Sequence, residues 1–169
     1  MARILLDTTY LLPALGIGVG LERFEEAFPR LLEEEEVLYN PLSLVEAKWI
    51  CLRLSRRRPD LRERLLSSFV SGLRALLGDE RLAQVPVTSP DVEEVADLLL
   101  ARGVRDYFDR MVYASAVCGD AALLTEDEEL LGLSGVPRPR EVLTWSDVLE
   151  SLSPSVSYTH LTLPTTERV

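Results

Sequence analysis

The sequence predicts an α/β protein in which helices cover both faces of a parallel β-sheet. Two observations support this prediction: the alternation of two kinds of apolar segment along the chain, and a length and hydrophobic content that suit one domain. Short apolar segments typical of buried strands alternate along the chain with longer segments whose apolar residues recur at helical spacing. This alternation is typical of parallel sheets, whose strands are buried on both faces. The chain has 169 residues, 47% of them hydrophobic, which suits one domain with a substantial core.

Five short segments are predicted to be strands. The first contains Ile4, Leu5 and Leu6, an apolar run of the length expected for a buried strand. In a parallel sheet, ligands bind beyond the carboxyl ends of the strands, so the residues that follow each strand are candidates for a site. The five segments are residues 3–6, 37–39, 83–87, 121–124 and 141–143.

Six segments between these strands are predicted to be helices. The segment 90–101 begins after Ser89, a favourable N-cap residue, and has Pro90 in its first position. The segment 42–54 is apolar on more than one side, so we expect it to be fully buried or to pack against another chain. The six segments are residues 21–32, 42–54, 60–77, 90–101, 107–117 and 126–131.

The net charge of −10 argues against broad, charge-driven binding of nucleic acid. It does not exclude an enzyme that acts on nucleic acid, because an acidic site that collects cations contributes to this charge. No apolar run approaches the length of a membrane span, and the N-terminus lacks the pattern of a signal peptide. Cys51 and Cys118 lack the spacing of metal ligands and are expected to be buried free thiols. These features predict a cytoplasmic protein with no membrane association.

The end of the chain differs in composition from the rest. The stretch VSYTHLTLPTTERV is rich in threonine, has no apolar periodicity and resembles a translated vector or adaptor sequence. We therefore expect one domain over residues 1–152 and a non-native or disordered tail over residues 153–169. The only histidine, His160, lies in this tail. The domain is therefore predicted to use neither histidine-based acid–base catalysis nor a histidine-ligated zinc ion.

Four acidic residues interrupt apolar segments. Asp7 ends the first strand, Glu46 lies within LSLVEAKWICL, Asp109 opens FDRMVYASAV, and Asp127 follows a strand in LLTED. One such acid alone is explained by a helix cap or an arginine partner. Four acids at one sheet edge would repel one another unless cations neutralise them. Mg²⁺ and Mn²⁺ prefer carboxylate oxygens, so the sequence predicts a site for Mg²⁺ or Mn²⁺ and hydrolysis of a phosphodiester by metal-activated water.

Taken in order, the segments ILLDTTYLL, LVEAKW, YFDRMVYASAV and ALLTED resemble the PIN-domain ribonucleases, and among them the VapC-type toxins of toxin–antitoxin pairs. The resemblance spans about residues 1–145. It implies a three-layer PIN-like fold with a central parallel five-stranded sheet flanked by helices. It also implies Mg²⁺- or Mn²⁺-dependent endonucleolytic cleavage of an RNA substrate, a homodimer, and a cognate antitoxin that occludes the acidic pocket.

The resemblance also implies roles for individual residues. Thr9 and Thr125 would orient the carboxylates of the pocket. Asp106 lies one helical turn before Asp109 and could share or take over its role as a ligand. The residues implied as metal ligands and catalytic groups are Asp7, Glu46, Asp109 and Asp127.

Other interpretations of the sequence stay open. Arg53 and Arg57, in an arginine-rich segment, could line a path for RNA, or could belong to a solvated helix paired with nearby acids. A phosphatase of the haloacid dehalogenase class would need an acid where Thr9 stands and a lysine near the site, whereas Lys48 is the only lysine. A non-catalytic binding module of the same fold is the other alternative.

Overall fold

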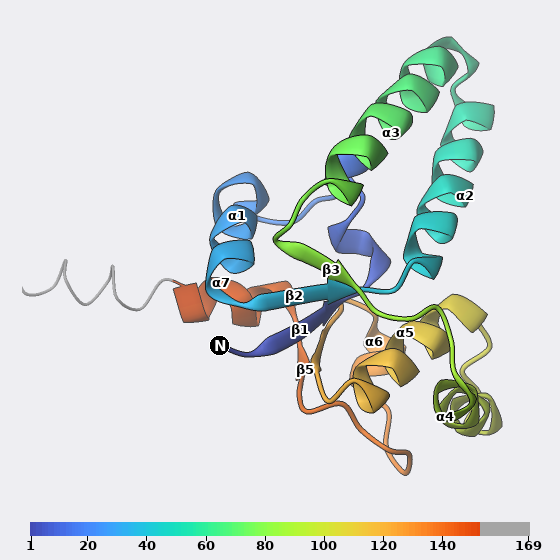
Figure 1. The fold of residues 1–169 in the computed structure, drawn as a ribbon. Coiled ribbons are helices and arrows are strands. Elements are labelled where there is room, and N and C mark those ends of the chain that lie inside the picture. Colours follow the sequence, from blue (N-terminus) through green and yellow to red (C-terminus); the bar gives the residue numbers. More distant parts are fainter. Residues whose placement is uncertain (153–169) are drawn as a thin grey trace, which may run out of the picture.

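The computed structural model describes residues 1–152, and its centre is an all-parallel five-stranded sheet (Figure 1). The strand order is β3-β2-β1-β4-β5, so β1 lies in the middle and pairs with both β2 and β4. The predicted fold class is therefore confirmed. The predicted tail, residues 153–169, lies outside the described residues. The strands are β1 (Arg3–Leu6), β2 (Glu36–Tyr39), β3 (Leu82–Gln84), β4 (Ala122–Leu124) and β5 (Val142–Leu143).

One strand differs from its predicted extent by more than one residue at an end. The strand β3 ends at Gln84, whereas the sequence predicted a strand that continued to residue 87. The N–H of Val85 still donates to the Tyr39 carbonyl at 3.0 Å. The next residue is Pro86, which has no N–H to continue the ladder. The proline therefore accounts for the early end of β3.

Seven α-helices lie within residues 1–152, together with short 3₁₀ turns. The segment predicted to be helical from residue 21 becomes helical only at Phe24, because Arg23 adopts a left-handed conformation with φ of 55°. Ser89 caps its helix as predicted, accepting a hydrogen bond from the N–H of Val92. The helices are α1 (Phe24–Glu34), α2 (Leu42–Arg57), α3 (Arg62–Leu77), α4 (Pro90–Ala101), α5 (Tyr107–Cys118), α6 (Glu128–Leu131) and α7 (Trp145–Leu152).

The core has two sides, one on each face of the sheet. Successive residues of a strand point to opposite faces, and in β1 Leu6 packs in one core cluster while Leu5 packs in the other. The first cluster draws on α1, α2, α3 and α7, and the second on α4, α5 and α6 (Figure 1). The result is the three-layer arrangement expected from the sequence.

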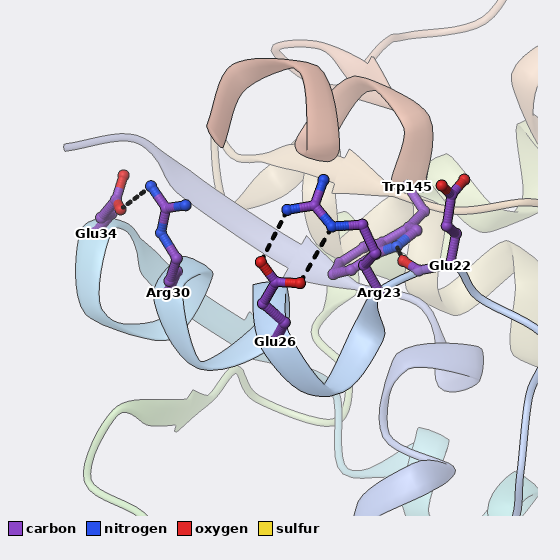
Figure 2. A network of polar contacts seen from close by, with 6 residues as sticks. All are labelled: Glu22, Arg23, Glu26, Arg30, Glu34 and Trp145. Carbon is purple, nitrogen blue, oxygen red and sulfur yellow. Dashed lines mark hydrogen bonds and ion pairs between the residues drawn. The ribbon is translucent and has the colours of Figure 1, made fainter. Parts of the chain in front are cut away.

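The helix α7 was not predicted. Its first residue, Trp145, is buried and packs at a centroid distance of 5.0 Å against Phe24 and 6.0 Å against Tyr10. The Trp145 indole N–H donates to the backbone carbonyl of Glu22 at 2.7 Å (Figure 2). These contacts fix α7 beside α1 and beside the turn that follows β1.

The helices α2 and α3 form an antiparallel pair that extends away from the sheet (Figure 1). They contact each other where the Lys48 ammonium lies 4.7 Å from the centre of the Phe69 ring. Within residues 1–152, α2 is not fully buried, because Val45 and Trp49 are 45% and 56% exposed. Ile50 is half-buried.

Two smaller expectations have clear outcomes. Within residues 1–152, no helix combines the length and the apolarity needed to cross a bilayer. Both cysteines are free thiols, and Cys51 is buried as expected, whereas Cys118 is exposed. Cys118 ends α5 directly before Gly119, where the chain turns towards β4, and this position leaves its side chain at the surface.

Candidate metal centre

The carboxyl ends of β1 and β4 carry two of the predicted acids. Asp7 follows β1, and its N–H donates to the carbonyl of Leu124, the last residue of β4, at 3.0 Å. Asp127 follows β4 and caps α6 by accepting from the N–H of Glu129 and Leu130. The first N–H groups of a helix or 3₁₀ turn have no partner within it, and the need to cap these groups accounts locally for an acid after each strand.

A cavity of about 370 Å³ opens at this edge of the sheet. The walls come from the ends of β1 and β4 and from the facing helices α2 and α5. The structure therefore brings together all four acids predicted from the sequence and also Asp106. The acidic residues that line the cavity are Asp7, Glu46, Asp106, Asp109, Glu126 and Asp127.

Carboxylate oxygens in this cavity lie close enough to share a cation. One oxygen each from Glu46, Asp106 and Asp109 lie within 4.8 Å of one another. The same holds for one oxygen each from Asp109, Asp127 and Glu129. Asp109 belongs to both groups and is therefore central to the cluster. Asp106 and Asp109 lie together rather than as alternatives, and the Asp106 carboxylate also caps α5 by accepting from the Asp109 N–H.

Asp7 lies beside these groups and is held by two hydrogen bonds. The side chain is 8% exposed. The oxygen Oδ1 accepts from the Thr8 N–H at 2.8 Å, and Oδ2 accepts from the Thr125 hydroxyl at 2.7 Å. The Thr125 oxygen in turn accepts from the Asp127 N–H at 3.0 Å. The buried Thr125 hydroxyl thus fixes the Asp7 carboxylate relative to the backbone of Asp127.

The hydroxyl after the first acid is placed differently from the expectation. Within residues 1–152, the Thr9 side chain lines the cavity but makes no hydrogen bond to Asp7. The neighbouring Thr8 hydroxyl donates instead to Glu46 Oε1 at 2.5 Å. A 3₁₀ turn starts directly after Asp7 and turns Thr8 towards α2. The sequence reasoning missed Thr8, although the pair of threonines in DTT was the available signal.

Burial and mutual repulsion raise the pKa values of the clustered acids. Burial and then the negative charges of Asp7 and Asp106 raise the pKa of Asp109 from 3.8 to about 8. Burial is also the main cause of the raised pKa values of Asp7 and Glu46. Within residues 1–152, none of the acids of this cavity forms an ion pair with arginine or lysine.

The donor set fits a hard divalent cation. Carboxylate oxygens are the ligands that Mg²⁺ and Mn²⁺ prefer. Within the described residues, the acids of this cavity are held by hydroxyl and N–H donors and not by basic side chains, which leaves a place for the charge of a cation. The residues placed to hold a cation are Glu46, Asp106, Asp109, Asp127 and Glu129, with Asp7 beside them.

Glu126 is a further residue of this site that was not predicted. Its Oε2 accepts from the Tyr10 hydroxyl at 2.5 Å and from the Trp145 N–H at 2.7 Å. One carboxylate therefore joins the turn after β1, the loop after β4 and the start of α7. Its position beside Asp127 in the TED segment was the available signal, but its partners could not be identified without α7.

The two arginines predicted to contact RNA are exposed on α2. The positive charge of Arg53 slightly lowers the pKa of Glu46, against the larger effect of burial, which raises it. Neither Arg53 nor Arg57 forms an ion pair within the described part of the chain. The alternative in which these arginines pair with nearby acids is therefore not observed.

The fold and the site together define an α/β domain with a carboxylate-lined cavity at the carboxyl edge of a parallel sheet. The sequence model of the PIN domain family matches residues 4–135, which is most of the chain. The chain therefore belongs to the PIN domain family, and the resemblance seen in its motifs is confirmed. A search of curated protein sequences found no match.

Solved structures of similar fold include a Mycobacterium tuberculosis member of the VapBC family of toxin–antitoxin systems. VapBC2 from Rickettsia felis, bound to a promoter DNA fragment, has 16% identity and a TM-score of 0.58 over 85% of this chain and 98% of that chain. PAE2754 from Pyrobaculum aerophilum has 14% identity and a TM-score of 0.59 over 90% and 96%. Mycobacterium tuberculosis VapC20, a toxin that cleaves the sarcin–ricin loop, has 21% identity and a TM-score of 0.52 over 80% and 99%. At these identities the likeness shows the fold.

Proposed function

We propose that this protein is a divalent-metal-dependent endoribonuclease. The observation that carries the proposal is the half-buried carboxylate cluster around Asp109, which has no basic partner among the described residues. Membership of the PIN domain family supports a nuclease. The absence of histidine from residues 1–152 agrees with hydrolysis that does not depend on an imidazole base.

The side chains of the cavity divide into two roles in this proposal. Asp7, Glu46, Asp109 and Asp127 hold the cation, with Asp106 close enough to contribute. Bound Mg²⁺ or Mn²⁺ would supply an activated water and neutralise charge on the phosphate. The hydroxyls of Thr8 and Thr125 keep Glu46 and Asp7 oriented by donating to their carboxylates.

The biological setting is also a proposal. We propose that the protein is the toxin of a toxin–antitoxin pair, that it acts on RNA in the cytoplasm as a homodimer, and that a cognate antitoxin occludes the acidic cavity. The likeness of the fold to a member of the VapBC family of toxin–antitoxin systems and to the toxin VapC20 supports this setting. The absence of a membrane-spanning helix within residues 1–152 agrees with it.

The test is cleavage of a labelled RNA by the wild type with Mn²⁺ or Mg²⁺, and again with EDTA. We expect EDTA to abolish cleavage and Asp109→Asn to slow it at least about 100-fold, because a ligand that stabilises the metal contributes several kcal/mol. Asp7→Asn is expected to slow it as well. Glu26→Gln, which removes an acid from the exposed face of α1, is the matched control and should cut RNA at the wild-type rate. Cleavage that persists in EDTA, or in both aspartate variants, would overturn the proposal.

A further inference from the structure

An exposed tryptophan lies on α2 beside the acidic cavity. The Trp49 side chain is 56% exposed, although large aromatic side chains are usually mostly buried. The ring meets Phe108 edge to face, with centroids 5.4 Å apart and planes at 87°. This contact covers part of the ring, and more than half of the residue stays open to solvent.

Two arginines surround this ring. A surface cavity of about 330 Å³ is lined by Trp49, Leu52, Arg53 and Arg56. Both arginines are exposed. In the part of the chain that the structure describes, neither forms an ion pair. An exposed tryptophan and two arginines that form no ion pair among the described residues therefore share one hollow.

The hollow lies on α2, the helix that also carries Glu46 of the carboxylate cluster. On α2, Glu46, Trp49 and Arg53 follow one another at spacings of three and four residues, which places them along one side of the helix. On α5, Phe108 directly precedes Asp109. Oxygens of Glu46 and Asp109 lie within 4.8 Å of each other, so the Trp49–Phe108 pair bridges the same two helices at the rim of the acidic cavity.

We propose that Trp49, Arg53 and Arg56 form a binding site for one nucleotide of a single-stranded RNA, next to the position of cleavage. The base stacks on Trp49, and the two guanidinium groups bind phosphates on either side of it. The inference rests on the proposed function, because it makes this hollow the place where the RNA chain is held as it enters the cavity.

The chemistry of the hollow favours RNA over a protein partner. A typical protein interface buries about 800 Å² per partner around a contiguous apolar centre. The exposed large apolar side chains of α2 are only Val45 and Trp49, and Trp49 is flanked by the two arginines. In a chain of net charge −10, unpaired arginines beside an acidic cavity give the phosphate backbone a local site of opposite charge.

The experiment measures RNA binding separately from cleavage. The probe is an oligoadenylate about ten nucleotides long, a length within the range that single-stranded sites cover. Binding is measured by fluorescence anisotropy in the Asp109→Asn background with EDTA, a condition in which the probe is expected to stay uncut. Intrinsic fluorescence is read in parallel, because the other tryptophan, Trp145, is buried at 3% exposure.

We expect Trp49→Ala to weaken binding about 5- to 150-fold, the range for loss of one stacked base. Trp49→Phe keeps an aromatic ring and should bind within about threefold of the parent, but without the quenching on RNA binding that Trp49 gives. Arg53→Gln and Arg56→Gln should each reduce the slope of log affinity against log salt by about 0.7. Arg140→Gln, in the loop at the opposite edge of the sheet, is the charge-matched control and should change neither quantity.

Three results would overturn this inference. Unchanged RNA affinity in Trp49→Ala would do so while leaving the nuclease proposal intact if the wild type cleaves RNA. Unchanged affinity together with altered self-association in the ultracentrifuge would assign the face to a protein interface. Absence of RNA binding in the parent would also contradict the inference, and the cleavage assay on the wild type would show separately whether the nuclease proposal fails with it.

Discussion

Acidic side chains have different partners in two regions of this molecule. Along the exposed face of α1, arginines neutralise the acids, as Figure 2 shows: Arg23 pairs with Glu26 at 2.9 Å and Arg30 with Glu34 at 3.6 Å. At the carboxyl edge of the sheet, by contrast, hydroxyl and N–H groups hold the acids, and no arginine or lysine within residues 1–152 forms an ion pair with them.

The pKa values follow this contrast. The Arg23 guanidinium lowers the pKa of Glu26, whereas burial and neighbouring carboxylates raise the pKa of Asp109 to about 8. Surface ion pairs of the first kind contribute little to stability. The clustered acids of the cavity destabilise the folded state in the absence of a cation. Their retention in one place is typical of a functional site.

The largest effect is expected from removing the Thr125 hydroxyl, which donates to the Asp7 carboxylate in the acidic cavity. We expect Thr125→Val to weaken Mn²⁺ binding about 10- to 100-fold, as loss of a group that orients ligands typically does. The valine leaves Asp7 Oδ2 without its donor and the Asp127 N–H without its acceptor. Isothermal titration calorimetry measures the affinity.

Thr125→Ser should restore most of that affinity, because it keeps the hydroxyl. Thr88→Val is the matched control, since the Thr88 hydroxyl also donates to a carboxylate, that of Glu93, but outside the cavity. Equal Mn²⁺ affinity in Thr125→Val and the wild type would show that Thr125 does not position the ligands.

A second test uses pH in metal-free buffer. Since the pKa of Asp109 is about 8 in the folded protein and its ordinary value is 3.8, the folded state holds the proton more tightly between these values. The free energy of unfolding should therefore fall as the pH rises through this interval. The raised pKa values of Asp7 and Glu46 act in the same direction.

Urea denaturation at several pH values in that interval measures the effect. Asp109→Asn should flatten the dependence and make the protein more stable than the wild type at the alkaline end. Glu26→Gln, whose carboxylate is neutralised by Arg23, should leave the dependence on pH close to that of the wild type. A wild-type stability that rises across this interval would contradict the assignment.

The smallest effect is expected on α1 itself. Glu26→Gln breaks the Arg23–Glu26 pair, both of whose side chains are largely exposed. Such pairs are screened by solvent, so we expect no measurable change in melting temperature or in Mn²⁺ affinity. Differential scanning calorimetry and titration calorimetry check both quantities. A clear loss of Mn²⁺ affinity would show that the two regions are coupled.

Most of the sheet and its helices could be predicted from the sequence because local signals agree with the tertiary structure there. The helix α7 was missed although its signals are present. Trp145, Val148 and Leu152 recur at helical spacing and are all buried. Thr144 and Asp147 form a reciprocal cap, in which each side chain accepts from the other residue's N–H. The segment is only eight residues long and lies next to the threonine-rich stretch, so its helical spacing was overlooked.

The acids of the site could be predicted because they stand out against apolar neighbours, but the groups that hold them could not. Whether Thr8 or Thr9 reaches Glu46 depends on a 3₁₀ turn that no residue spacing specifies. The two partners of Glu126, Tyr10 and Trp145, lie more than a hundred residues from each other in the sequence. Side-chain contacts across such separations follow from the packed structure alone.

The bonds of Glu126 bear on where this protein can be shortened. The family match stops at residue 135, yet the Trp145 N–H and the Tyr10 hydroxyl meet on the Glu126 carboxylate beside the acidic cavity. A chain trimmed to the matched segment would lose β5, which pairs with β4, and the tryptophan that packs against Tyr10. We therefore expect the smallest active form to extend through Leu152, beyond the part by which the family is recognised.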